Sequence, residues 1–422
     1  MLIIKFNSRL IKRLLPSIFI TSLILIFIRS GTFIPVPGIN HLDVLFSMER
    51  NSATQNLIRT FLGDKIFIIG LFTLNIFPAI NATIILQFLI GFSPQLSKLQ
   101  KEGDFQGRRE ISRLTRNITV ILAIIQSIGV TLYLRPILFD WNVILASQIV
   151  IWLTAGAMIV LWLSEVITDY GLGNGTSLLV YTNIVSNLPN LISKIATDNT
   201  ENTMVLSAMS MFGLGILILG ALYAIVLLQN STLNINLISS KRLSRASAQY
   251  DGNDSISYLP LRFNQAGVMP IILTTSVLVI PNYLINLGIF QSLNFLINFK
   301  WIYWIGYFVL ILAFSSFYSS IVLNPKDISD QLQKSAVKIP GVRPGVQTIY
   351  YLKQEIQRIT LMGATLLAFI TIIPNFIEST LNITSLNGLS TTSFLILGGV
   401  VLDLKREVSN IYFSEIYTDM YR

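Results

Sequence analysis

Cysteine is absent from this 422-residue chain, and histidine occurs once, at His41. These absences exclude a disulfide scaffold and a thiol-based redox or zinc site. They also exclude a Ser-His or Cys-His catalytic pair that does not use His41. Charged residues are also scarce, at 12% of the chain, where soluble domains carry about 25%. Hydrophobic residues make up 52% and the mean hydropathy is +0.65, which excludes an intrinsically disordered chain. The composition predicts a protein that crosses a membrane several times.

Stretches without charged residues divide the chain into ten predicted transmembrane helices, because about 20 apolar residues cross the hydrocarbon core of a bilayer. An even number of spans places both termini on the same side. The predicted spans are Leu14–Pro35, Ile66–Phe92, Asn117–Leu134, Trp141–Ser164, Thr176–Ile192, Met204–Leu228, Asn264–Leu287, Trp301–Leu323, Ile359–Ile377 and Ser390–Leu404.

Lysine and arginine are distributed unequally around these spans, and the net charge is +9. Most of the 30 basic residues lie at the termini and in the connections after the second, sixth and eighth spans. The positive-inside rule assigns this side to the cytoplasm or its organellar equivalent, so both termini are expected there. The bias alone accounts for basic connections. Their length, at residues 229–263 and 324–358, favours a large partner docking on that face.

Ionisable side chains are nearly missing from the spans, with Arg29, Glu165 and Glu378 at or near span ends. One candidate function is that of an ion-coupled secondary transporter with inverted repeats. Such a transporter needs a titratable or ion-binding group inside the membrane. An intramembrane enzyme would need a His/Asp or Ser/Lys constellation, and the sequence carries no nucleotide-hydrolysing or metalloprotease motif. No enzymatic activity, cofactor or metal is therefore predicted, and any energy for transport must come from partners or gradients.

The second predicted span carries amide side chains within an apolar stretch. Asn75 and Asn81 lie on either side of Pro78, which is expected to break the helical hydrogen-bond ladder. The seventh span has a similar pattern around Gly267 and Pro270. Polar residues in these positions should face protein or water rather than lipid. The pattern fits either hydrogen bonding between helices or a pore lining with a seam that separates.

Two glycine-containing motifs lie in the connections. Residues 171–176, GLGNGT, resemble a dinucleotide-binding fingerprint only superficially, because no strand precedes them, and they predict a tight turn between the fourth and fifth spans. In residues 339–345, IPGVRPG, two Pro-Gly pairs bracket Arg343 and predict turns on both sides of it. A guanidinium on such a stiff tip makes bidentate contacts to carboxylate or phosphate; a solvated loop arginine is the alternative.

Several long motifs, found in order along the chain, resemble the SecY family, the channel-forming subunits of the Sec protein translocase. The resemblance runs from the first span to the tenth. The matching runs are Thr32–Ile39, Asn75–Gln87, Lys101–Arg116, Ile167–Leu179, Leu259–Pro270 and Asn324–Thr348.

The resemblance implies an all-α membrane protein of ten transmembrane helices in two pseudo-symmetric inverted halves, residues 1–200 and 201–422, around a pore. Its constriction would be a ring of aliphatic side chains, which excludes water and ions by dewetting. Spans two and seven would form a lateral gate to lipid. The ring positions are Ile76, Ile80, Val180, Met269, Ile272 and Ile396, and the gate positions are Asn81, Gln87, Thr275 and Ser276.

The resemblance also implies partners. They are a SecE-like small subunit, a SecG-like subunit, the SecA motor ATPase, the ribosome, signal-sequence-bearing client polypeptides and membrane lipid. A plug would lie at about residues 52–64, and the docking residues for motor and ribosome would be Lys241, Arg242, Arg245, Lys338 and Arg343. A composition rich in Ile, Asn and Ser favours a plastid thylakoid membrane with both termini in the stroma; a bacterial plasma membrane is the alternative.

Overall fold

The computed structural model of the chain describes residues 8–37, 70–93, 95–96, 99, 105–135, 141–197, 204–239, 257–265, 267, 269–275, 277, 300–381 and 391–420. The chain divides into two compact units. The first comprises residues 1–204, 384–390 and 400–422, and the second comprises residues 205–383 and 391–399.

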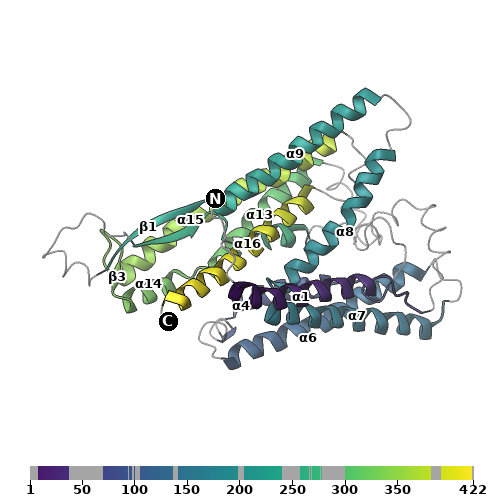
Figure 1. Ribbon diagram of the computed structural model, residues 1–422, viewed down its shortest axis with the longest axis horizontal. Helices are drawn as coiled ribbons and strands as arrows, with labels where there is room; N and C mark the ends of the chain where they lie inside the picture. Colours follow the sequence, from purple (N-terminus) through teal and green to yellow (C-terminus); the bar gives the residue numbers. More distant parts are fainter. Residues whose placement is uncertain are drawn as a thin grey trace. The chain divides into compact units, whose positions relative to one another are not determined.

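Long apolar helices build the first unit. Helix α6 packs against α4 and α7, and α7 also packs against α1 and α8 (Figure 1). A partly buried hydrogen bond of 3.1 Å between Ser127 of α6 and Thr154 of α7 joins two of these helices in their apolar middle. The bounds of the helices are α1 Ser8–Gly31, α4 Phe77–Phe92, α6 Phe105–Leu134, α7 Val143–Tyr170 and α8 Gly175–Thr197.

The second unit combines apolar helices with a small sheet. Helix α13 packs along α15, and a hydrogen bond of 2.7 Å joins Ser319 to Thr360 between them. Helix α16 contributes its first residues to this unit and its later residues to the first. The bounds are α9 Met204–Asn230, α13 Lys300–Val322, α14 Pro325–Lys334, α15 Val346–Leu381 and α16 Thr391–Met420.

Within the described residues, helices occupy most of the predicted spans, and the predicted fold class is confirmed. Five helical segments of the described residues are long and apolar enough to cross a membrane: Leu14–Gly31, Arg109–Leu132, Val143–Tyr170, Trp304–Lys334 and Val346–Ile373. The segments Phe77–Gly91 and Leu219–Asn230 are shorter apolar helices. Of the seventh predicted span, residues 269–275 are helical, and its later part lies outside the described residues.

A three-stranded antiparallel sheet, which the sequence did not predict, lies in the two long basic connections. Its order is β2-β1-β3, and the strands are β1 Thr232–Ser239, β2 Ser257–Arg262 and β3 Val337–Lys338. One side of the sheet contributes Ile235 and Leu261 to a buried cluster with Ile339, Leu352 and Ile356. Helix α15 begins before the predicted span, because its N-terminal part forms one wall of this small core (Figure 1).

The prediction that Pro78 breaks the second span is wrong. Pro78 lies in the first turn of α4, where its missing N–H is not needed by the helix. The residues before it are irregular, and Asn75 has a left-handed backbone with φ of 46°. The proline thus stands in the first turn of a helix rather than interrupting one.

Candidate functional site

Two of the predicted ring residues stand at the start of α4. Ile76, the residue before the helix, has 1% of its surface exposed, and Ile80, one turn later, has 8%. The N–H of Ile80 donates to the carbonyl oxygen of Ile76 at 3.0 Å. The two side chains are therefore one helical turn apart and lie on the same face. A third predicted ring residue, Val180, is half-buried on α8 in the same unit.

The side chain of Asn75 connects this start of α4 to α8. Its Oδ1 accepts a hydrogen bond of 2.8 Å from the backbone N–H of Ile76. Its Nδ2 donates to Oδ1 of Asn183 at 2.9 Å. Asn75 was predicted to face either protein or water, and its partner Asn183 was missed. The signal that could have found it is a second asparagine on a charge-free span, three residues after Val180.

The other predicted ring residues belong to the second unit. Met269 and Ile272 are half-buried in the helical residues 269–275, and Ile396 on α16 is 8% exposed. A turn precedes the first pair, in which the Nδ2 of Asn264 donates to the carbonyl of Gly267 at 2.8 Å. Because the ring residues are divided between the two units, their meeting around one axis stays a prediction.

The predicted gate residues lie on α4 and in residues 269–275. Asn81 and Gln87 are half-buried on α4. The hydroxyl of Thr275 donates to the carbonyl of Ile272 at 2.9 Å, within its own helix. Ser276 lies outside the described residues, and the expected contact between Asn81 and Ser276 stays a prediction.

The predicted tight turn between the fourth and fifth spans is confirmed at Gly171–Gly175. Gly173 has a φ of 87°, and a Cβ at Gly175 would lie 1.9 Å from the carbonyl oxygen of Ser164. The side chain of Thr168 links the two ends of the turn. Its Oγ1 accepts a hydrogen bond from the N–H of Gly175 and donates one to the carbonyl oxygen of Ser164, both at 2.9 Å. Only glycine fits where α7 and α8 approach so closely.

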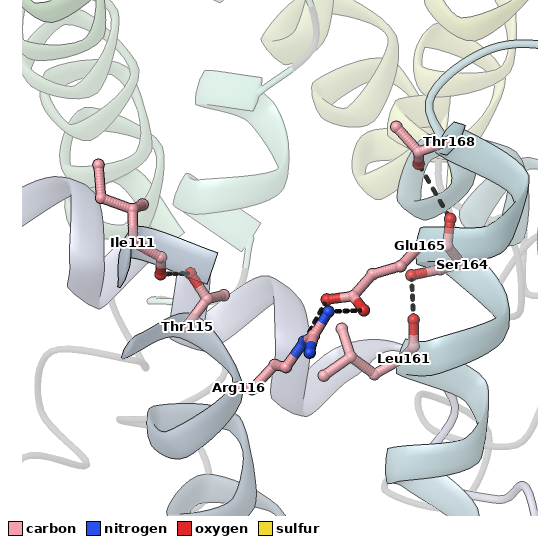
Figure 2. Close-up of polar contacts among 7 residues, drawn as sticks. All are labelled: Ile111, Thr115, Arg116, Leu161, Ser164, Glu165 and Thr168. Carbon is pink, nitrogen blue, oxygen red and sulfur yellow. Dashed lines mark hydrogen bonds and ion pairs between the residues drawn. The ribbon is translucent and has the colours of Figure 1, made fainter. Parts of the chain in front are cut away.

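Beside this turn, Arg116 of α6 makes a two-pronged ion pair with Glu165 of α7 (Figure 2). Its Nε donates to Oε1 at 3.0 Å and its Nη2 to Oε2 at 2.7 Å. The carboxylate that the sequence places near a span end thus has a charged partner on the neighbouring helix. Both side chains are partly exposed, which is the usual position for charges at the end of a span.

The tip that carries Arg343 is exposed and held by the core beneath it. Gly341 and Gly345 on either side have φ values of 76° and 102°. The hydroxyl of Thr348 donates to the carbonyl of Arg343 at 2.9 Å, and Ile339 at the start of the loop is buried. Of the other predicted docking residues, Lys338 is exposed on β3, whereas Lys241, Arg242 and Arg245 lie outside the described residues, as does the predicted plug.

Comparison with known proteins identifies the family. A family model described as SecY matches residues 70–405. The chain belongs to the SecY family. The protein translocase subunit SecY of Trieres chinensis is 53% identical to it, over 98% of this chain and 98% of the relative. Among solved structures, a protein conducting channel is 17% identical, covers 96% of this chain and 94% of its own, and superposes with a TM-score of 0.66.

A second solved structure, Sec61 in the canine ribosome-channel complex from the endoplasmic reticulum, is 16% identical. It covers 96% of this chain and 94% of its own, with a TM-score of 0.63. Because the two structures are only 17% and 16% identical to this chain, they support the fold alone. The function is inferred from the SecY relative. The chain is accordingly an integral membrane protein and the central pore subunit of a protein-conducting channel. The SecY family is a family of channels rather than catalysts, and nothing supports the secondary-transporter alternative.

Proposed function

We propose that a ring of aliphatic side chains in this SecY-family channel forms the constriction through which unfolded polypeptides pass. The observation that carries the proposal is the buried, charge-free first turn of α4, where Ile76 and Ile80 share one face. Val180 supplies the same chemistry from α8. The full set is Ile76, Ile80, Val180, Met269, Ile272 and Ile396.

Aliphatic side chains suit a seal that must open and close around different client sequences. They offer no hydrogen bonds to water or ions, so a narrow ring of them stays dry when empty. They also make no specific bond to a passing chain. Met269 adds adaptability, because its unbranched side chain changes shape at little cost.

Ion leak through the resting channel tests the ring. Purified channel in proteoliposomes is compared with Ile80→Asn and Ile396→Asn, which place an amide in the constriction. Both variants are expected to raise the leak. The matched control is Ile85→Asn on the same helix, because Ile85 is 39% exposed and should face away from the ring. Equal leak in the Ile80, Ile396 and Ile85 variants and the unchanged channel contradicts the ring assignment.

The lateral gate is proposed to open between α4 and the helical residues 269–275. The half-buried amides of Asn81 and Gln87 support this, because an amide exposed to lipid costs free energy and these side chains should therefore face another helix or a water-filled path. Thr275 and Ser276 are the proposed residues on the opposite side. A hydrophobic client segment would leave the pore through this seam.

The docking surface for the SecA motor and the ribosome is proposed to include the exposed tip at Arg343 and neighbouring Lys338. Support comes from the tip's fixed backbone, because a partner that binds a rigid loop loses less conformational entropy on docking. The structural relative Sec61 occurs in a ribosome-channel complex, which supports the ribosome as a partner. Lys241, Arg242 and Arg245 are proposed to extend the same basic surface.

The assembly is proposed to contain a SecE-like small subunit and a SecG-like subunit in a plastid thylakoid membrane, with both termini in the stroma. Support comes from the algal source of the SecY relative and from the basic connections of the chain. Affinity purification of the chain in mild detergent from thylakoids should recover a single-span partner in equal amount. If the chain is recovered only from a bacterial plasma membrane and not from thylakoids, the proposed thylakoid location is wrong.

A further inference from the structure

Asn75 has an unusual backbone next to a ring residue. Among the described residues other than glycine, only Asn75 and Ala336 have a positive φ, and that of Asn75 is 46°. Asparagine tolerates this left-handed region better than most residues, because its short polar side chain bonds locally. Asn75 is also buried, with 6% of its surface exposed. A buried residue in this conformation fixes the direction in which α4 begins.

Both ends of the Asn75 amide are used in a short chain of hydrogen bonds. The N–H of Ile76, which precedes the regular helix and needs a partner outside it, donates to Asn75 Oδ1 at 2.8 Å. On the other side, Asn75 Nδ2 donates to Asn183 Oδ1 at 2.9 Å. The backbone of Ile76 is thus linked to α8 through one side chain.

On α8, Asn183 comes three residues after Val180, so the two side chains project from the same face of the helix. The α8 end of the hydrogen-bond chain is therefore beside a predicted ring residue, and the α4 end is the backbone of another. Apolar packing alone lets two helices slide by small amounts. A pair of amide hydrogen bonds is directional and sets one spacing.

We propose that Asn75 and Asn183 form a clasp that sets the spacing between the α4 and α8 parts of the constriction. The clasp rests on the proposed ring. Neither asparagine is proposed to line the pore; both are positioning residues that hold Ile76, Ile80 and Val180 where they close it. Asn75 is buried and Asn183 half-buried, so water competes less for their hydrogen bond than it does at the surface.

Two substitutions remove the clasp with little other change. Asn75→Gly keeps a residue that accepts positive φ and deletes the amide. Asn183→Ala deletes the partner and places a strong helix former on α8. Because one net hydrogen bond changes an equilibrium about 5-fold, each variant is expected to raise the resting ion leak about 5-fold. Both variants remove the bond between Asn75 and Asn183, and Asn75→Gly also removes the bond from the N–H of Ile76. The double variant should therefore leak no more than Asn75→Gly alone.

A matched control separates positioning from general stability. Ser127→Ala deletes the hydrogen bond of 3.1 Å between Ser127 and Thr154, which joins α6 to α7. This variant is expected to lower the thermal unfolding temperature by as much as Asn183→Ala and to leave the leak unchanged. A leak in the Ser127 variant equal to that of the clasp variants would reduce the asparagines to ordinary packing residues and overturn the proposal.

The outcomes also distinguish the clasp from the ring. If Ile80→Asn raises the leak while Asn75→Gly and Asn183→Ala do not, the clasp is refuted and the ring stands. If the effects of the two asparagine variants multiply in the double variant, they act independently and the clasp is again refuted. If Ile80→Asn leaves the leak unchanged, the ring itself fails.

Discussion

Gly156 of α7 lies against the chain segment that leads into α4, and replacing it tests how tightly that segment is held. A Cβ added to Gly156 would lie 1.9 Å from the carbonyl oxygen of Leu71 and 2.9 Å from its carbonyl carbon. Both atoms belong to the backbone, so no side-chain rotation relieves the clash. Gly156→Ala must move either α7 or the segment before Asn75.

The expected magnitude follows from two opposing effects. Overpacking a tight contact destabilises a protein by about 1–3 kcal/mol. Alanine in place of glycine stabilises a helix interior by about 1 kcal/mol, which offsets part of the loss. At Gly220 of α9 an added Cβ meets nothing within 4 Å, so Gly220→Ala shows the favourable effect alone. The difference in unfolding free energy between the two variants is therefore expected to be about 1–3 kcal/mol.

Thermal unfolding of the detergent-solubilised channel measures this difference, with resting ion leak as a second readout. Gly156→Ala should unfold at a lower temperature than Gly220→Ala and should leak more, because the displaced segment ends at Ile76. Equal unfolding temperatures for the two variants would show that the backbone approach between α7 and Leu71 is looser than 1.9 Å implies, and the reasoning would be refuted.

Three further substitutions test other parts of the account. Arg343→Lys should reduce motor-driven translocation mildly and Arg343→Glu severely, with leak unchanged, because the first keeps the charge and the second reverses it; normal transport by the Glu variant would make Arg343 a solvated loop residue. Cysteines at Asn81 and Ser276, in a chain without other cysteines, should form a disulfide that blocks client insertion until reduced, and undiminished insertion by fully crosslinked channel would contradict the gate. Arg116→Ala should lower the unfolding free energy by at most about 1 kcal/mol, since Arg116 and Glu165 are 52% and 28% exposed; a loss that does not shrink in high salt would show that the pair is less solvated than its exposure indicates.

The parts of the fold that the sequence predicts are those decided by neighbouring residues. Uninterrupted apolar stretches predict the spans, and the glycines at 171–175 and the Pro-Gly pairs around Arg343 predict local turns. Partners far apart in sequence were missed. Asn75 and Asn183 are separated by 108 residues, and β1 pairs with β3 from a different connection. Pro78 misled because proline has opposite effects within a helix and in its first turn, and the sequence does not say where the helix begins.

The most direct test of the central claim is whether a translocating client touches the proposed ring. A photo-crosslinking residue is placed at Ile80, Val180 or Ile396, and in a control at Ile121, whose side chain is 58% exposed on α6. A client stalled midway through the membrane is then irradiated. The account predicts crosslinks from the three ring positions and none from Ile121. Crosslinks from Ile121 with none from the ring positions would contradict it.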